Sequence, residues 1–143
     1  SWQAHDAAIT CLAFAERAAL LCSGSEDGRV RLWRPTDSGA ACVTTLRVGS
    51  DSPKATTMYS LAVEPVAGQV LCAGGSDGVV QMWDLQTHTL LHVLSGHSSS
   101  TVRALGFMPD GTLCSAGGDS KFLKWQVPLF AADTVEGDVV AVD

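Results

Sequence analysis

Residues 20–33 read LLCSGSEDGRVRLW, and this stretch decides how the chain folds. A short apolar run leads into Asp27-Gly28, a pair typical of tight turns because glycine adopts positive φ at no steric cost. From Arg29 to Trp33 polar and apolar side chains then alternate, as they do in a strand with one buried face. The stretch therefore predicts a strand, a tight turn and a second strand.

The same pattern occurs twice more in the chain. Residues 70–83 read VLCAGGSDGVVQMW, and residues 112–125 read TLCSAGGDSKFLKW. In each stretch an aspartate follows the cysteine by five residues, and a tryptophan follows the aspartate by six. Repetition at fixed spacing indicates equivalent structural units that stack and bury a shared core.

Each repeat is flanked by further apolar runs that read as strands. The runs before the repeats are residues 9–14, 58–63 and 102–107, and those after them are 41–46 and 90–94. For the third repeat, the outer strand is expected within residues 127–132. Each unit is thus predicted to be a four-stranded antiparallel meander, and the chain to be all-β without a helix.

Two histidines have the same place relative to the repeats. His5 precedes Trp33 by 28 residues, and His97 precedes Trp125 by 28. The following turn aspartate lies 22 residues after the histidine in both cases. The histidines therefore belong to the repeated unit.

On these motifs the chain resembles the WD-repeat β-propeller family. Leu94-Ser-Gly-His97 is similar to the Gly-His element that opens a blade, and Trp83-Asp84 is the Trp-Asp dipeptide. Trp83 and Trp125 are 42 residues apart, within the family period of roughly 40–45. Trp33 and Trp83 are 50 apart, and the excess falls in a polar loop around residues 47–57.

The resemblance implies a partial β-propeller of three four-stranded antiparallel WD-repeat blades, spanning residues 1–143. The expected repeats are about 5–46, 57–94 and 97–132, with 133–143 as a tail or the start of a next blade. Propellers close with typically 4–8 blades. Residues 1–4 are expected to end an outer strand and residues 137–142 to begin a first strand, so the remaining blades are expected from the same longer chain or by self-association.

The resemblance also implies a buried hydrogen-bond relay in each blade, from histidine through serine and aspartate to the tryptophan indole. Its expected members are His5, Ser23, Asp27 and Trp33 in the first repeat, and His97, Ser115, Asp119 and Trp125 in the third. The second repeat keeps Asp77 and Trp83 but has Ala73 in place of the serine and no histidine before Met58. A less rigid second blade is therefore expected, with its loop at residues 47–57 freer to adapt. Arg34 and Gln126 stand where the family often has aspartate.

Partner binding is expected on the narrow rim, where the family commonly binds peptides. By position, the resemblance points to Thr10, Glu26, Tyr59, Ser76, Thr101 and Arg103. Tyr59 and Arg103 are favoured, because aromatic and arginine side chains supply most of the anchoring energy at interfaces. Arg103 is also suited to an acidic or phosphorylated residue.

Three patterns that resemble catalytic or metal sites have simpler structural interpretations. Gly74–Gly78 matches Gly-x-Ser-x-Gly, but a strand follows it where a nucleophile elbow needs a helix. His5, Ser23 and Asp27 contain the residue types of a catalytic triad, yet the family buries them. His88 and His92 would lie about 13 Å apart on a strand, too far to bind one zinc ion together. We therefore expect no enzyme activity, metal or cofactor.

Composition narrows the partners and the compartment. The net charge of −6 argues against nucleic acid and against an anionic membrane as partner. The five cysteines include no Cys-x-x-Cys, and Cys22, Cys72 and Cys114 share one repeat position that suggests core packing. This usage favours a reducing, intracellular compartment, either cytoplasmic or nuclear.

The expected function is a non-catalytic protein-protein interaction scaffold or adaptor segment that presents a peptide-binding propeller rim. Two alternatives stay open at this point. The blades could dock substrate for a larger enzyme or enzyme complex, or they could belong to a nucleic-acid-associated propeller.

Overall fold

The computed structural model describes residues 1–47, 56–98, 100–126 and 138–142, which form three four-stranded antiparallel sheets. The first sheet contains β1 (Ile9–Ala15), β2 (Leu20–Ser25), β3 (Arg29–Thr36) and β4 (Gly39–Arg47). The second contains β5 (Met58–Val63), β6 (Val70–Gly75), β7 (Val79–Asp84) and β8 (Leu90–Ser95). The third contains β9 (Val102–Phe107), β10 (Leu113–Gly117), β11 (Phe122–Gln126) and β12 (Asp138–Val142).

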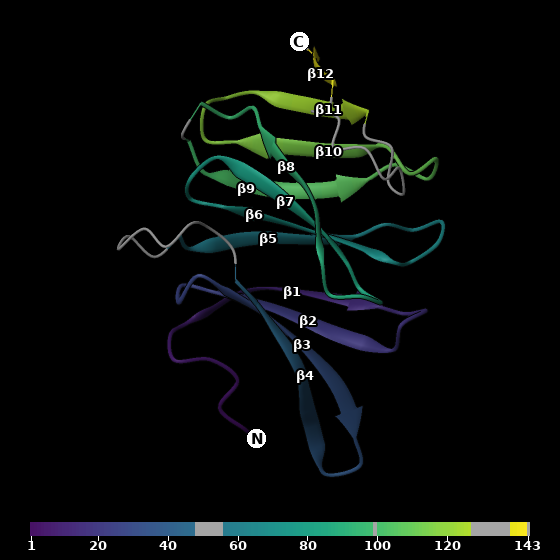
Figure 1. The fold of residues 1–143 in the computed structure, drawn as a ribbon. Coiled ribbons are helices and arrows are strands. Elements are labelled where there is room, and N and C mark those ends of the chain that lie inside the picture. Colours follow the sequence, from purple (N-terminus) through teal and green to yellow (C-terminus); the bar gives the residue numbers. More distant parts are fainter. Residues whose placement is uncertain (48–55, 99, 127–137, 143) are drawn as a thin grey trace.

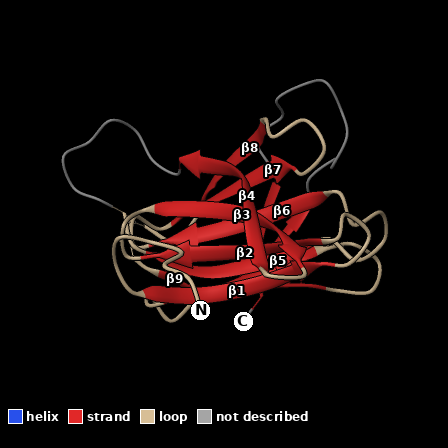
Figure 2. Ribbon diagram, turned by 90° about the horizontal axis from the view of Figure 1, so that it is seen from below, coloured by secondary structure: helices blue, strands red, loops and turns tan. Residues whose placement is uncertain are grey.

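All secondary structure in the described ranges is strand, which confirms the all-β prediction (Figure 2). Within each sheet the strand order follows the chain order, so each sheet is a simple meander. The sheets stack face to face, with β1, β5 and β9 as neighbours along one side of the stack (Figure 1). No helix in these ranges is long and apolar enough to cross a bilayer.

The turn between the second and third strand of each sheet requires a left-handed residue. Gly28, Gly78 and Ser120 occupy this position with φ of 77°, 79° and 63°. The preceding aspartate of each turn accepts a hydrogen bond from the amide two residues further on, at 2.9–3.1 Å. Glycine and a short polar residue meet the same requirement, which explains why Asp-Gly and Asp-Ser recur at this point.

The core consists of two apolar layers between the sheets. Leu32, Met58 and Leu71 are fully buried between the first and second sheets, and Met82 and Val102 between the second and third. The second sheet is therefore covered on both faces, and every residue of β6 is buried.

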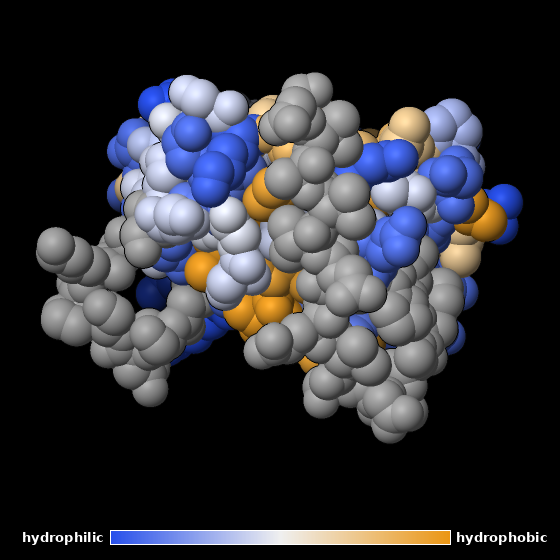
Figure 3. All heavy atoms as spheres, turned by 90° about the horizontal axis from the view of Figure 1, so that it is seen from above, coloured by the Kyte–Doolittle hydropathy of each residue, from blue (hydrophilic) through white to orange (hydrophobic). Residues whose placement is uncertain are grey.

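The first and third sheets each have an outer face with exposed apolar side chains. Leu12 and Phe14 on β1 are 61% and 56% exposed, and Phe122 on β11 is 46% exposed. The strand registers place Phe122 at the position of Val30 and Val80, which are fully buried in the other two sheets. Seen from the side of the third sheet, hydrophobic surface is visible between two hydrophilic regions (Figure 3).

The structure differs from the sequence prediction at two ends of the chain. β12 pairs with β11, so a segment expected to begin a next blade supplies the fourth strand of the third sheet. The strand expected within 127–132 lies outside the described residues. Residues 1–4 form no strand, and Trp2 instead packs against Trp33 with ring centroids 6.0 Å apart.

Candidate interaction surface

A buried chain of hydrogen bonds links four side chains of the first sheet. The Trp33 indole Nε1 donates to Ser23 Oγ at 2.9 Å, and Ser23 Oγ lies 2.7 Å from His5 Nε2. His5 Nδ1 lies 2.9 Å from Asp27 Oδ2. Because the carboxylate accepts, Nδ1 carries the proton and Nε2 accepts from the serine hydroxyl.

The third sheet repeats this chain with nearly the same geometry. Trp125 Nε1 donates to Ser115 Oγ at 2.8 Å, Ser115 Oγ lies 2.7 Å from His97 Nε2, and His97 Nδ1 lies 3.0 Å from Asp119 Oδ1. His97 is fully buried, and Ser115 is 1% exposed. Each network ties the second and third strands to the turn between them and to the segment before the first strand.

The serine in these networks is unsuited to nucleophilic catalysis. Ser23 is 2% exposed, and its oxygen already contacts both the indole of Trp33 and the imidazole of His5. A nucleophile must reach a substrate beside an oxyanion site. The geometry instead satisfies polar groups that would be costly to bury alone.

The second sheet lacks this network. Ala73 stands at the serine position, and the buried Trp83 Nε1 has no hydrogen-bond partner among the described residues. The Oε1 atom of buried Gln81, which pairs with Ala73 across the strands, also lacks one there. Among the described residues, Asp77 accepts one hydrogen bond, from the Val79 amide at 3.1 Å, as the other turn aspartates do. Of the loop at residues 47–57, which was expected to adapt more freely, residues 48–55 lie outside the described residues.

The two turn carboxyls of the networks have lowered pKa values. For Asp27, burial acts to raise the pKa, but the hydrogen bonds from the His5 side chain and the Arg29 amide outweigh it. For Asp119, the corresponding bonds from His97 and the Lys121 amide likewise outweigh desolvation and lower the pKa. Both carboxylates are therefore held in the charged form that accepts the histidine proton.

The repeated cysteines lie in or beside the core, and all five thiols are free. Burial raises the pKa of Cys22 to about 12, and it also raises the pKa of Cys72 and Cys114. Thiols with raised pKa remain protonated and react poorly. Their placement fits packing, while Cys42 is exposed on β4.

The rim surface is built on one repeated backbone irregularity. We define it by the six residues predicted from the sequence, Thr10, Glu26, Tyr59, Ser76, Thr101 and Arg103. The pairing of first and second strands skips one residue in each sheet, and the skipped residues are Thr10, Tyr59 and Arg103. Such bulges re-aim a side chain and are common beside functional sites.

Equivalent backbone hydrogen bonds close the rim in all three sheets. The amides of Glu26, Ser76 and Gly118 donate to the carbonyls of Ala8, Thr57 and Thr101, at 3.0, 2.9 and 2.9 Å. Glu26 and Ser76 are therefore equivalent to Gly118, and Thr101 stands where the other two sheets have Ala8 and Thr57.

Only part of the rim surface is free to contact a partner. Tyr59 is 42% exposed, and Glu26 and Arg103 are also exposed. Thr10 is partly buried, and its hydroxyl reaches the Met58 carbonyl of the second sheet. Ser76 is also partly buried and accepts from the Thr57 amide at 3.1 Å. Thr101 is partly buried as well, so Glu26, Tyr59 and Arg103 are the most accessible side chains of the group.

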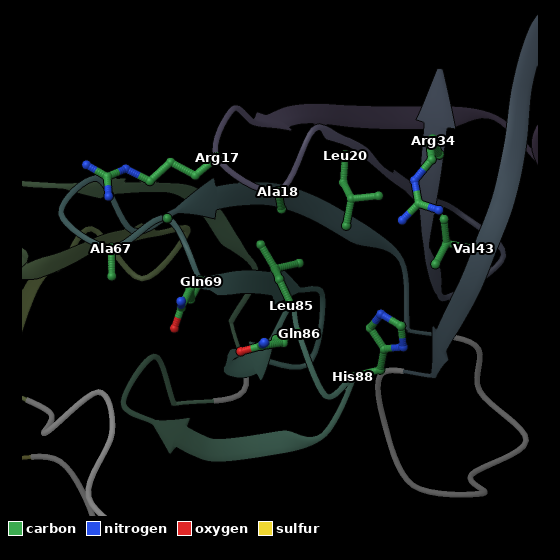
Figure 4. A pocket seen from close by; sticks show the side chains of 11 residues that line it. Arg17, Ala18, Leu20, Arg34, Val43, Ala67, Gln69, Leu85, Gln86 and His88 are labelled. Atoms are coloured by element: carbon green, nitrogen blue, oxygen red, sulfur yellow. The ribbon is translucent and has the colours of Figure 1, made fainter. Parts of the chain in front are cut away.

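A hollow of about 460 Å³, which was not predicted from the sequence, lies between the first and second sheets at the ends of the strands opposite the rim (Figure 4). Its lining includes Arg17, Leu20, Arg34, Leu85 and His88. The one sequence signal was Arg34, which stands where the family often has aspartate. Across the described ranges, no cluster of three metal-ligating side chains occurs.

Face-to-face stacking of four-stranded antiparallel meanders, with their first strands side by side, defines the β-propeller class. The family described as "WD domain, G-beta repeat" matches residues 1–34 and 88–126, about half of the chain. The chain belongs to this WD-repeat family.

The relatives that the chain resembles are much longer proteins. Coronin-7 of Mus musculus is 35% identical over 101 residues, covering 68% of this chain and 11% of coronin-7. Transducin beta-like protein 3 of Bos taurus is 31% identical over 128 residues, covering 88% of this chain and 15% of that protein. Meiotic recombination protein rec14 of Schizosaccharomyces pombe is 32% identical over 116 residues, covering 81% of this chain and 33% of rec14.

A solved structure supports the fold. The WD40 β-propeller domain of Doa1 aligns with a TM-score of 0.71 at 22% identity, covering 87% of this chain and 38% of the Doa1 chain. The similarity confirms the propeller architecture predicted from the repeats.

Proposed function

We propose that the chain is a non-catalytic scaffold or adaptor segment that holds a partner peptide on the rim surface. Propeller domains of the WD-repeat family generally mediate protein interactions. The observation that carries the proposal is the placement of Tyr59 and Arg103 at equivalent bulges of adjacent first strands, both exposed. A rigid surface of this kind lowers the ordering cost of binding.

The two side chains supply complementary chemistry for a peptide. Tyr59 offers an aromatic face and a hydroxyl, while Arg103 offers a planar set of donors suited to a carboxylate or phosphate. Arg103 lies beside Gly118, where an added Cβ would be 3.6 Å from its Nε. The absence of a side chain at Gly118 leaves room around the guanidinium.

The test compares partner capture by wild-type chain and by the double variant Tyr59→Ala, Arg103→Ala. Capture of lysate proteins is quantified by mass spectrometry, with Val93→Ala, Arg47→Ala as the control because both residues are exposed on the outer strands β8 and β4. We expect the rim variant to lose at least tenfold of the specifically captured protein, since anchoring side chains contribute about 2 kcal/mol or more each. Capture equal to wild type, with unchanged melting, would reject this surface.

We further propose that the three sheets are part of one propeller of repeats 5–46, 57–94 and 97–132, completed by further blades of the same longer chain or by a second copy. The exposed outer faces of the first and third sheets support this arrangement.

The free thiols support an intracellular location, cytoplasmic or nuclear. The net charge of −6 disfavours the nucleic-acid alternative.

A further inference from the structure

A second surface lies at the far ends of the strands from the rim. The hollow between the first and second sheets is bordered by the β1–β2 turn, the end of β3, the β5–β6 turn and the β7–β8 turn. We call it the inter-sheet hollow and define it by its lining side chains Arg17, Leu20, Arg34, Gln69, Leu85 and His88. Its volume of about 460 Å³ is within the range of ligand pockets, roughly 300–1,000 Å³.

The lining is cationic although the chain is acidic. Arg17 and Arg34 contribute two permanent positive charges, and no aspartate or glutamate is among the lining residues. Both arginines are exposed, and no ion pair involves either of them in the described part of the chain. Their charges are therefore available to an external anion.

Two carboxylates close in sequence to the hollow, Glu64 and Asp84, have partners in the backbone, whereas Glu16, next to Arg17, and Asp37, after β3, are exposed. Glu64 is 1% exposed, and its oxygens accept from the amides of Val66, Ala67 and Gly68. Asp84 accepts from the amides of Gln86 and Thr87 at 2.7 and 3.1 Å. Both groups stabilise the turns that border the hollow.

Arg34 owes its freedom to a departure from the repeat pattern. In the second sheet the equivalent residue, Asp84, binds the β7–β8 turn. In the first sheet Arg34 lies in a longer hairpin and pairs with Ala41 through the backbone alone. Its guanidinium points into the hollow, as does the ring of His88 (Figure 4).

The arginine at the other end is held in place by packing. The aliphatic stem of Arg17 lies against the Gly68 backbone, where an added Cβ would meet three of its carbons at 3.1–3.2 Å. The floor between the two arginines is lined by the apolar side chains of Leu20 and Leu85, which are 4% and 3% exposed, and of Ala18 and Val43, which are half-buried. The hollow thus has an apolar base with an arginine on either side, although the guanidinium of the exposed Arg17 extends away from Leu20 and Leu85 (Figure 4).

We propose that the inter-sheet hollow binds an acidic peptide segment in which carboxylate side chains flank an apolar one. The carboxylates pair with Arg17 and Arg34, and the apolar side chain covers the half-buried Ala18 and Val43 above Leu20 and Leu85. Two arginines suit a few discrete carboxylates, whereas the overall charge of −6 repels a long polyanion. This site is separate from the rim surface and independent of the function proposed for it.

The test measures fluorescence anisotropy of a dye-labelled peptide, Gly-Glu-Leu-Glu-Gly, titrated with the full chain. A peptide with glutamine in place of both glutamates is the ligand control. We expect Arg17→Gln, Arg34→Gln to weaken binding at least tenfold, because charge-assisted hydrogen bonds are lost. Two control variants should bind the peptide with an affinity within twofold of wild type. They are Arg47→Gln, which removes one exposed charge on β4, and the double variant Tyr59→Ala, Arg103→Ala.

A charge-reversal experiment separates recognition from misfolding. Arg17→Glu, Arg34→Glu should bind the matching Gly-Lys-Leu-Lys-Gly peptide better than wild type does, with an unchanged melting curve. The proposal is overturned if the glutamine peptide binds as well as the glutamate peptide, or if the double glutamine variant retains binding. It is also overturned if Arg47→Gln weakens binding equally, or if only a phosphoserine peptide binds.

Discussion

At the scale of single residues, the second sheet differs from its neighbours by lacking the serine and the histidine of the hydrogen-bond network. Ser23 and Ser115 each receive an indole N–H and contact a histidine, whereas Ala73 leaves the Trp83 Nε1 without a partner in the described structure. An unpaired buried donor costs about 1–3 kcal/mol. The second sheet therefore carries a local penalty that its burial on both faces offsets.

Removing the hydroxyl from the third sheet and adding one to the second should change the free energy of unfolding in opposite directions. Ser115→Ala should lower the free energy of unfolding by about 1–3 kcal/mol, because it strands both the Trp125 indole and the buried His97. Ala73→Ser should raise it by up to about 1 kcal/mol, since the new hydroxyl can accept from Trp83. Urea unfolding monitored by tryptophan fluorescence measures both changes, and coincident curves for all three proteins would contradict the assignment.

At the scale of elements, neighbouring sheets approach closely where glycine replaces a side chain. A Cβ added at Gly74 on β6 would lie 2.6 Å from a Val102 methyl group on β9 and 2.7 Å from Ser60 Oγ. Gly106, the second-to-last residue of β9, has no atom within 4 Å of the same hypothetical Cβ. A methyl group would therefore collide with the neighbouring sheet at Gly74 and meet no neighbour at Gly106, so the two positions can be compared as test and control.

Gly74→Ala should destabilise the stack by roughly 1–3 kcal/mol, because the methyl group forces β6 and β9 apart in a packed core. Gly106→Ala should leave stability unchanged or raise it slightly, because alanine restricts the unfolded chain without meeting a neighbour. Thermal unfolding followed by circular dichroism distinguishes the two. If both variants melt alike, the contact between these sheets is not as close as the structure places it.

Elements set by local patterns were predictable, and those set by distant pairing were not. The strand at Met58–Val63 and the turn at Gly28 follow from alternation and turn chemistry within a few residues. β12 has the same local character as a first strand, and only its pairing with β11 makes it the fourth. The inter-sheet hollow is lined by side chains of two sheets that lie far apart in the sequence, such as Arg17 and His88, so no contiguous motif predicted it.

At the scale of the whole molecule, each outer face of the stack is equivalent, through the repeat, to a face that is buried between two sheets. The face of β1 that exposes Leu12 and Phe14 corresponds to the face that the second sheet packs against the first. The face that exposes Phe122 corresponds to those of Val30 and Val80 in the two existing junctions. The two faces are thus different and mutually complementary, which favours head-to-tail contact over a symmetric one.

This complementarity predicts that copies of the chain associate as concentration rises. Sedimentation should give an average mass that increases above 14.9 kDa, because each contact removes the exposed Leu12 and Phe14 from water. Leu12→Lys, Phe14→Lys should hold the chain at 14.9 kDa, while Leu90→Lys, Val93→Lys on the exposed outer strand β8 should associate like wild type. A wild-type mass that stays at 14.9 kDa across the concentration range would show that the outer faces of two copies do not bind each other. Completion of the propeller by further blades of a longer chain would then be the arrangement that the exposed faces favour.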